Sequence, residues 1–310
     1  MHACGARTKL AAMPGPHFVV NPNSGGGRAR ALLPRLTAAL KAVYPEHQVS
    51  LTQGHGDAVR LAREAADGGA SAVVAVGGDG TLHEVVNGVV GASRAAPVAL
   101  IPGGRGSDFA RGTGIPHDLD ACLELLAAPP RPIDVGRVRT PSATAHFINI
   151  ADAGLGGFTV DTANRWRLPV SGQLTYFLAS AWGLVSYSGS PMKLTFDDQR
   201  LEGRFLVVAV GNSSYFGGGM HVCPRARPDD GLFDVTVMEA RGLLHLIRHL
   251  DGLYGGTLEG RPGMHAFRCR TLTLESPAPV PLDIDGERAE GVPITFEVLA
   301  GALPFHLPPR

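Results

Sequence analysis

The sequence predicts a two-domain protein, with an α/β domain on a parallel sheet followed by a domain that is mostly an antiparallel β-sandwich. The chain has 310 residues, enough for about two domains. Up to about residue 135, short apolar strands alternate with helical patterns, which is typical of a parallel sheet. Beyond that point strands follow one another with few helices. The domains are therefore expected at residues 1–135 and 136–302.

In the first domain, each expected strand is a short apolar run that ends in a turn rich in glycine or polar residues. These strands are expected at residues 18–20, 49–52, 72–76 and 98–101. Helices are expected between them at residues 32–43, 57–66 and 82–90. In the first helix the apolar residues recur at i, i+4, i+7 and i+8, which indicates one buried face. Asp57 precedes the second helix as a favourable N-cap.

The second domain contains six apolar runs that read as strands, several of them joined by turns with Gly or Asp. These runs are residues 147–151, 205–210, 232–238, 271–274, 281–284 and 294–299. Helices are expected at 174–185 and 243–254. The apolar face of the 174–185 helix is expected to pack against the β domain. Contact with a membrane interface is the alternative, because Trp182 lies on that face and Arg165 and Arg167 lie upstream.

Composition and charge exclude several classes of protein. Lys and Arg number 28, Asp and Glu number 28, and apolar residues make up 44% of the chain. This balance argues against a disordered chain and against a nucleic-acid partner, which usually needs a basic footprint. The chain has no leader-like apolar segment, no apolar run long enough to span a membrane, and four widely separated cysteines. A cytoplasmic location is expected.

Three glycine-rich turns follow predicted strands, at residues 21–27, 77–81 and 102–108. Glycines allow backbone N–H groups to approach an anion, and a following helix adds its positive N-terminal end. In an open parallel sheet the carboxyl ends of the strands form the ligand-binding edge. The turns therefore predict one phosphate site, although any one of them could be a plain connection. The Walker pattern is absent, which excludes an ordinary P-loop NTPase.

The second turn reads Gly-Gly-Asp-Gly-Thr, which resembles the nucleotide-phosphate motif of diacylglycerol, sphingosine and NAD kinases and of phosphofructokinases. Further motifs select among these families. In chain order they are Asn21-Pro22-x-Ser24-Gly25-Gly26, Thr52 with Gly56-Asp57-Ala58, Glu84-Val85-Val86-Asn87-Gly88, Ser107-Asp108-Phe109-Ala110-Arg111, Ile133-Asp134-Val135-Gly136, Asn149-Ile150-Ala151-x-Ala153-Gly154, Gly211-Asn212, Asp229-Asp230-Gly231-Leu232 and Asp285-Gly286-Glu287. Together they resemble the bacterial diacylglycerol kinase-like lipid kinases over nearly the whole chain.

This resemblance implies ATP- and Mg²⁺-dependent transfer of phosphate to a lipid hydroxyl, such as that of diacylglycerol or a sphingoid base. It also implies an NAD kinase- or phosphofructokinase-like first domain, and a C-terminal segment, residues 303–310, that returns to it. The implied ATP-binding residues are Asn21, Ser24, Gly25, Thr52, Gly77, Gly78, Asp79, Gly80, Thr81, Arg105 and Asp108. Arg105 stands where the family usually has Thr, and an arginine there is able to contact phosphate.

Glu287 and Asp79 are the expected catalytic residues. Glu287 matches the proposed general base of the family and follows Asp285-Gly286, a strong hairpin-turn signal that would hold it rigidly. Without the resemblance it reads as a solvated carboxylate. Asp79 lies within the phosphate turn and is expected to act through Mg²⁺; the alternative is that it braces the turn by accepting N–H bonds.

A second, structural Mg²⁺ is implied by the resemblance, with Asp230 as a side-chain ligand and the carbonyls of Arg227 and Leu232. The expected partners are a lipid substrate, a transient peripheral contact with the inner membrane face, and a second copy of the chain in a homodimer. Two rival functions stay open: an NAD-kinase-like enzyme, and a non-catalytic protein that binds lipid or nucleotide on a kinase fold.

Overall fold

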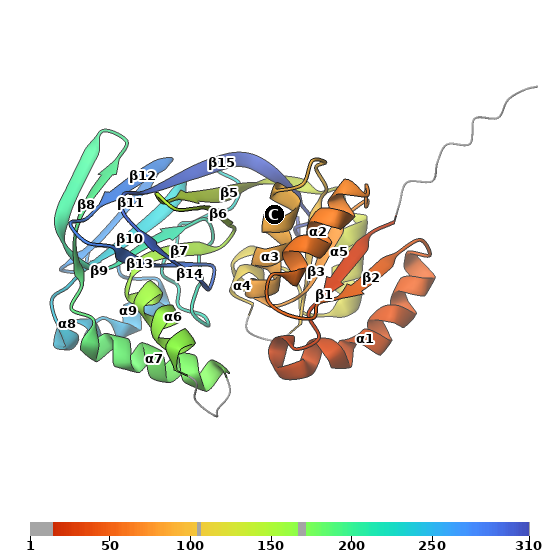
Figure 1. Cartoon of the computed structure of the whole chain (residues 1–310), viewed down its shortest axis with the longest axis horizontal. Helices are drawn as coiled ribbons and strands as arrows, with labels where there is room; N and C mark the ends of the chain where they lie inside the picture. The colour runs from red at the N-terminus through yellow and green to blue at the C-terminus, as the bar shows by residue number, and fades with distance from the viewer. Residues whose placement is uncertain (1–14, 104–106, 167–171, 310) are drawn as a thin grey trace, which may run out of the picture.

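The computed structural model describes residues 15–103, 107–166 and 172–309, and its two halves lie side by side along the long axis (Figure 1). The first half contains four strands that pair in parallel in the order β2-β1-β3-β4. They are β1 (His17–Val20), β2 (Gln48–Leu51), β3 (Val73–Gly77) and β4 (Val98–Pro102). The predicted parallel sheet is therefore confirmed.

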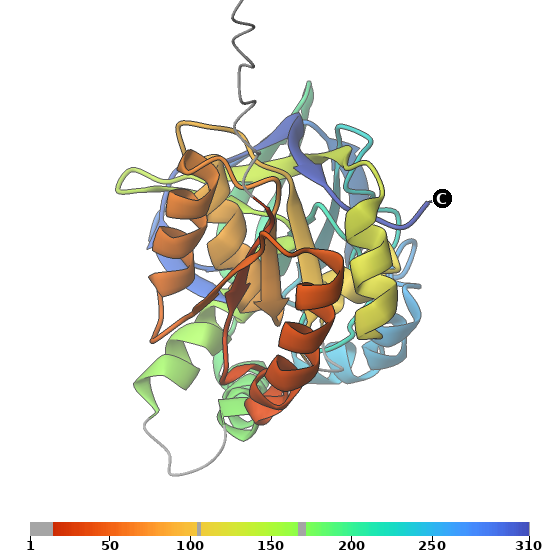
Figure 2. The same ribbon diagram turned by 90° about the vertical axis from the view of Figure 1, so that its right-hand side faces the viewer.

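Helices cover both faces of this sheet (Figure 2). One face packs against α2 (Asp57–Asp67), α3 (Asp79–Val90) and α4 (Asp108–Thr113), and the other against α1 (Ser24–Val43) and α5 (Leu119–Ala127). Successive strand residues point to opposite faces, so each buried strand supplies both cores.

Helix α1 differs in part from its sequence prediction. Leu36 and Leu40 are buried as the periodicity predicts, but Val43 is 54% exposed because the helix ends there. At the other end, Gly25, Gly26 and Gly27 have φ values of 61°, 68° and 90°. This left-handed backbone favours glycine, so the chain makes a turn before the regular helix begins.

The second half is a β-sandwich whose two layers share one apolar core. One layer has the order β14-β13-β7-β9-β10-β11, and the other contains β8, β12, β15, β5 and β6. The long strand β9 belongs to both layers, because its first part pairs with β8 and its last part with β7 and β10. The strands are β5 (Arg131–Arg139), β6 (Thr144–Phe147), β7 (Ile150–Gly154), β8 (Ser190–Phe196), β9 (Gln199–Gly211), β10 (Phe233–Glu239), β11 (Met264–Cys269), β12 (Thr271–Glu275), β13 (Val280–Ile284), β14 (Glu287–Gly291) and β15 (Ile294–Phe305).

Two expected elements of this half are wrong in detail. The strand expected at 147–151 is the end of β6 and the start of β7, separated by a break at residues 148–149. The helix expected at 243–254 is two short helices, α8 (Leu243–Ile247) and α9 (Leu250–Gly255). The strand–helix unit formed by β7 and α6 (Leu155–Arg165) was not predicted beyond its first residues.

Strand β15 connects the two halves. It runs antiparallel to β5 over most of its length, and at its end Phe305 pairs in parallel with Val98 of β4. Asp134, in β5, accepts hydrogen bonds from Gly301 N at 2.8 Å and from Gly231 N at 2.7 Å. One buried carboxylate thus ties β15 to the turn before β10, close to the junction.

The expected burial of the apolar face of helix α7 (Gly172–Ser186) is wrong. Its buried side carries the small residues Thr175, Ala179 and Gly183. A Cβ at Gly183 would lie 3.0 Å from Leu155 Cδ1, so α7 packs closely on α6 there. Leu174, Leu178, Trp182 and Val185 are exposed to solvent. Within the described residues, no helix combines the length and apolar character needed to cross a membrane.

Candidate active site

A cavity of about 390 Å³ lies where the carboxyl ends of the parallel strands face the β13–β14 hairpin. It brings together seven of the predicted site residues, which come from four separate segments: Asn21, Ser24, Thr52, Gly78, Gly80, Thr81 and Glu287. Its other lining residues are Asn23, Gly54, His55, Ala58 and Glu84. The structure therefore places the first two glycine-rich turns and the predicted base around one space.

The first two turns are joined by side-chain contacts. Asn21 Nδ2 donates to Thr81 Oγ1 at 3.3 Å, and Asn21 Oδ1 accepts from Asn23 N at 3.1 Å. A Cβ at Gly77 would lie 2.4 Å from Thr81 Oγ1, so only glycine fits there. Gly77 and Gly25 do not line the cavity; they shape the turns that do.

Asp79 braces the third turn. Its Oδ1 accepts from Ser107 Oγ at 2.9 Å and from Phe109 N at 3.1 Å, and its Oδ2 accepts from Asp108 N at 2.8 Å. Burial raises the pKa of Asp79 to about 6. These bonds match the bracing alternative considered from the sequence, and a magnesium-linked or catalytic role for Asp79 stays a prediction.

The Asp108 side chain is directed toward the second half of the molecule. Its Oδ2 accepts from Gly218 N at 2.7 Å, and its Oδ1 pairs with Arg111 at 2.6 Å. Burial raises the pKa of Asp108. Asp108 is not among the lining residues of the cavity, and Arg105 lies outside the described residues.

Glu287 is presented by a tight hairpin turn, as the sequence predicts. Asp285 and Gly286 have φ values of 53° and 95°, and Glu287 pairs with Ile284 directly after them. The Glu287 side chain is 39% exposed. His55 lies between two carboxylates, with Nε2 3.6 Å from Glu287 Oε2 and Nδ1 3.3 Å from Glu84 Oε1. No role was predicted for His55, although it directly precedes the Gly56-Asp57-Ala58 motif.

The Asp285 side chain joins this hairpin to the residues between β6 and β7 by hydrogen bonds. Its carboxylate accepts hydrogen bonds from the backbone N–H groups of Ile148 at 2.8 Å, Asn149 at 3.1 Å and Ile150 at 3.0 Å. The side chain is 1% exposed. These three N–H groups leave the sheet ladder to bind a carboxylate, which explains the break in the predicted strand. Sequence reasoning identified the turn but missed this role.

His83, on α3, also contacts the Asp285 carboxylate. We call Asp285, the backbone N–H groups of residues 148–150 and His83 the cage. Its Nδ1 lies 3.3 Å from Asp285 Oδ2, and Asn87 Nδ2 donates to the carbonyls of His83 and His146. Burial lowers the pKa of His83, but the Asp285 carboxylate, with Glu287 and Glu84 nearby, raises it more, so the net shift is upward. The cage links α3, which follows the phosphate turn, to the hairpin that carries Glu287.

Two further buried carboxylates, Asp283 and Asp152, lie on the strands next to this hairpin turn. Asp283 of β13 is directly opposite Asp152 of β7 in the antiparallel ladder. Asp283 Oδ1 accepts from Gly286 N at 2.6 Å and Asp152 Oδ2 accepts from Gly156 N at 2.8 Å, but Asp152 Oδ1 is buried without a partner. Burial raises the pKa of Asp283 to about 7 and that of Asp152 well above its usual range.

This pair makes the stability of the fold dependent on pH. Since the folded-state pKa of Asp283 is raised above its usual 3.8, the stability that protonated Asp283 contributes is fully present below pH 3.8 and is lost as pH rises toward 7. We expect Asp152→Asn to reduce this loss, because it removes a buried carboxyl whose own raised pKa contributes to it. Urea unfolding of both proteins at pH 5 and pH 8 measures the difference. Equal pH dependence in the two proteins would contradict the role of the pair.

At the predicted structural magnesium site, the Asp230 carboxylate contacts other groups of the protein. Asp230 forms an ion pair with Arg268, and its Oδ1 accepts from Leu232 N at 3.2 Å. No group of three or more His, Cys, Asp or Glu side chains suited to a metal occurs in the part of the chain that the structure describes. The Asp230 carboxylate is thus occupied by protein donors, and ligation by Arg227, Asp230 and Leu232 stays a prediction.

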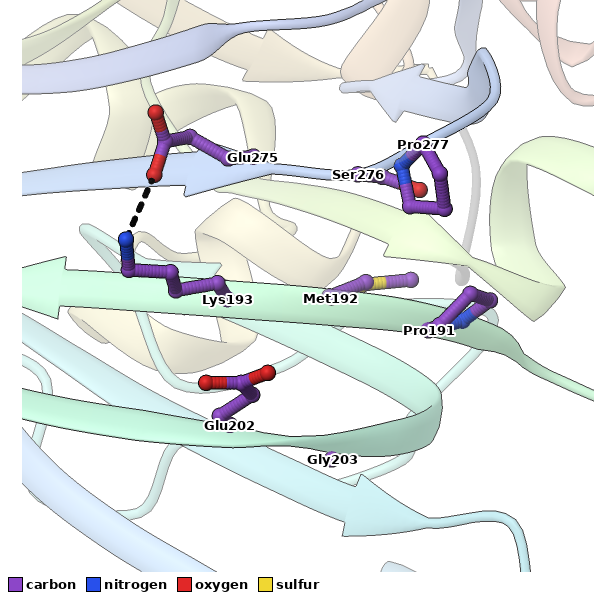
Figure 3. A pocket seen from close by; sticks show the side chains of 8 residues that line it. All are labelled: Pro191, Met192, Lys193, Glu202, Gly203, Glu275, Ser276 and Pro277. Carbon is purple, nitrogen blue, oxygen red and sulfur yellow. Dashed lines mark ion pairs between the residues drawn. The ribbon is translucent and has the colours of Figure 1, made fainter.

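A second cavity, of about 440 Å³, lies at the outer end of the sandwich, between the β8–β9 hairpin and the end of β12 (Figure 3). Its charged groups are Glu202 and an ion pair at 3.3 Å between Lys193 and Glu275. It contains none of the predicted site residues. The cavity at the glycine-rich turns is the better candidate for chemistry.

Comparison with known proteins agrees with this geometry. The diacylglycerol kinase catalytic domain family matches residues 16–138, and the YegS C-terminal NAD kinase beta sandwich-like domain family matches residues 149–306. A protein of Pseudomonas aeruginosa strain PAO1, named "Probable lipid kinase YegS-like", is 35% identical over 275 residues, 87% of this chain and 88% of that protein. The chain belongs to the YegS-like lipid kinase family.

A second YegS-like protein agrees with this assignment, and a solved structure shares the fold. An Alcanivorax borkumensis protein of the same name is 29% identical, covering 85% of this chain and 87% of its own. A crystal structure of a diacylglycerol kinase from Bacillus anthracis str. Sterne superposes with a TM-score of 0.74 over 96% of this chain and 97% of its own. Its 24% identity makes this a likeness of fold. As a family member, the YegS-like chain is a phosphotransferase that acts on an alcohol group.

Proposed function

We propose that this YegS-like kinase transfers the γ-phosphate of Mg²⁺·ATP to a hydroxyl of a lipid such as diacylglycerol or a sphingoid base. The observation that carries this proposal is the shared cavity, in which Glu287 faces the turns that carry Ser24 and Gly78 to Thr81. Phosphoryl transfer requires that phosphate charge be held in place and that the attacking hydroxyl lose its proton.

The chain supplies donors for the phosphates at the beginning of one helix and at one glycine turn. Gly78 precedes α3, so the first N–H groups of α3 have no acceptor inside the helix and lie beside the cavity. Ser24, which also lines the cavity, precedes the left-handed turn of Gly25 to Gly27. A Cβ at Gly78 would point toward Ser24 Oγ at 3.4 Å, which shows how closely the backbone borders this space. The residues present therefore fit a phosphate chain, and bound ATP would supply the γ-phosphate.

Glu287 then acts as the general base. A lipid hydroxyl that enters the cavity beside Glu287 would give its proton to this carboxylate as its oxygen bonds to the γ-phosphorus of ATP. The bond from that phosphorus to the β–γ bridging oxygen would break, and ADP would leave. The turn fixed by Asp285 limits the positions that Glu287 adopts, and fixed geometry is a large part of catalysis in phosphoryl transfer. His55 lies beside this carboxylate, with Nε2 3.6 Å from Glu287 Oε2.

An acceptor panel tests the proposal. The full chain is incubated with ATP labelled in the γ-phosphate, with and without Mg²⁺, and with diacylglycerol, sphingosine, phosphatidylglycerol or NAD. We expect label in at least one lipid, and loss of transfer when EDTA removes Mg²⁺. Transfer to NAD alone would support the NAD-kinase-like rival. Failure to bind Mg²⁺·ATP in calorimetry would support a non-catalytic protein.

Gly78→Ala is expected to weaken ATP binding by about tenfold, because the added methyl group takes space beside the cavity. The backbone of Gly78, with φ −101°, accepts alanine without strain. The matched control is Gly255→Ala on α9, where an added Cβ meets nothing closer than 3.7 Å. Calorimetry with Mg²⁺·ATP measures both. Equal affinity in the two variants would place the phosphates elsewhere.

A further inference from the structure

Helix α7 exposes a stripe of large apolar side chains. Leu178, Trp182 and Val185 are 39%, 53% and 71% exposed, and their spacing of four and three residues places them on one face. Leu174, one turn earlier, lies on the same face. Contiguous exposed apolar side chains of this size mark an interaction surface on a folded protein.

The opposite face of α7 packs against the protein, so the stripe faces solvent. Ala179 is fully buried, and Gly183 lies against Leu155 and Thr159 of α6. Leu184 packs against an apolar cluster that includes Leu206. Turning the stripe inward would put Trp182 where only small residues fit. Its exposure is therefore a property of the folded helix.

The neighbouring helices α8 and α9 expose apolar side chains as well. Leu244, Ile247 and Tyr254 are 64%, 53% and 62% exposed. Leu253 of α9 packs in the same cluster as Leu184 of α7, so both elements cover the same part of the sandwich. We call the exposed side chains of these helices, Leu178, Trp182, Val185, Leu244, Ile247 and Tyr254, the apolar platform.

The charged residues within two segments that contain or adjoin these helices are all arginines. Residues 162–192 and 240–250 contain four arginines and no Asp or Glu, and Arg165, Arg241 and Arg248 are exposed. Arg165 and Arg241 pair with acids just outside these segments, Asp161 and Glu239, and Asp251 of α9 pairs with Arg261. Arg248 directly follows Ile247, so an exposed positive charge lies beside the platform. A surface with apolar side chains and arginines is complementary to anionic lipid headgroups above an acyl layer.

We propose that the apolar platform docks this kinase on the surface of an anionic phospholipid bilayer. The proposal rests on the proposed function, because a lipid acceptor dissolved in a bilayer reaches the cavity only if the protein contacts that bilayer. Figures 1 and 2 show α7 at the same edge of the molecule as the beginning of α1, where Ser24 lines the cavity. Docking through α7 brings this edge to the lipid surface. Trp182 is suited to the headgroup region, since its ring is both apolar and polar.

Vesicle co-sedimentation tests the proposal with the full chain. We expect at least tenfold tighter binding to vesicles of phosphatidylcholine with phosphatidylglycerol than to phosphatidylcholine alone, and a binding that weakens with salt. The double variant Trp182→Glu/Val185→Glu should lose at least tenfold in affinity. Val43→Glu is the matched control, because Val43 is 54% exposed on α1 and lies outside the platform. Circular dichroism and the thermal midpoint check that both variants are folded.

Two results would overturn the docking proposal. The first is that the double variant binds mixed vesicles as tightly as the control does. The second is that the wild-type chain forms a dimer in sedimentation velocity and the double variant does not, because a second copy of the chain would then cover the platform. A short-chain, dispersed diacylglycerol separates this proposal from the proposed function. Loss of turnover by the double variant on vesicles, with turnover on the dispersed acceptor kept, supports docking. If wild type binds vesicles but phosphorylates no acceptor, the function has failed and docking stands.

Discussion

Replacing Glu287 with glutamine is expected to lower kcat by about a hundredfold to ten-thousandfold, the range that a positioned general base contributes. Glutamine keeps the size of the side chain and its place after the Asp285-Gly286 turn, but it cannot take the proton of the acceptor hydroxyl. Glu287 lines the cavity and is partly exposed, so the change should leave the fold and the KM for ATP nearly unaltered. Steady-state assays with varied ATP and acceptor separate the two parameters.

The control for this variant lies three residues along the same strand. Glu290→Gln changes an exposed carboxylate of β14 that pairs with Arg288 and is not among the lining residues of the cavity. It should retain the activity of the wild-type kinase. If both glutamine variants keep full activity while folded, Glu287 is not the base. If both variants lose activity equally, the loss comes from a change in the hairpin and not from the missing Glu287 carboxylate.

Asp285→Asn is expected to reduce the free energy of unfolding by about 3–5 kcal/mol, the cost of breaking a buried ion pair on one side. Three backbone N–H groups and His83 converge on this carboxylate, which is almost fully buried. An amide places its own N–H groups against some of these donors and removes the charge that faces His83. Activity should fall as well, because the turn that positions Glu287 loses its anchor.

Chemical denaturation measures this effect, with Asp198→Asn as the control. Asp198 lies in the turn between β8 and β9 and is exposed, so its replacement should leave the midpoint unchanged. The raised pKa of His83 adds a second readout: the stability that the Asp285–His83 pair contributes is present at low pH and is lost as pH rises through that pKa. The variant should show less of this loss. An unchanged midpoint would mean that the cage contributes little.

Local patterns predicted most of what positions the site. The strands that carry the first two glycine-rich turns were expected from short apolar runs, and the Asp285-Gly286 turn from its type, because these features depend on neighbours in the chain. The resemblance to lipid kinases then identified Ser24, Thr81 and Glu287, which the structure brings to one cavity. Their meeting could not follow from spacing alone, since more than 200 residues separate Thr81 from Glu287.

The missed features depend on contacts between distant segments. Asp285 and the N–H groups of residues 148–150 are far apart in the chain and come into contact only in the folded sandwich. No local sequence pattern therefore predicts the cage. Asp79 was expected at a metal, yet its partners belong to the next turn of the sheet edge. The apolar face of α7 was expected inside, because periodicity shows that a helix has two faces but not which face is covered. The small residues opposite that face carried the missing signal.

We propose that Glu287 and the phosphate turns act together on a lipid hydroxyl, and one measurement tests this directly. The most direct measurement is the transfer of labelled γ-phosphate from ATP to extracted lipid acceptor by the wild-type chain and by Glu287→Gln, at saturating Mg²⁺·ATP. We expect labelled phospholipid with the wild-type chain and at least a hundredfold slower transfer with the variant, at equal ATP affinity. Equal rates of transfer by the two folded proteins would contradict it.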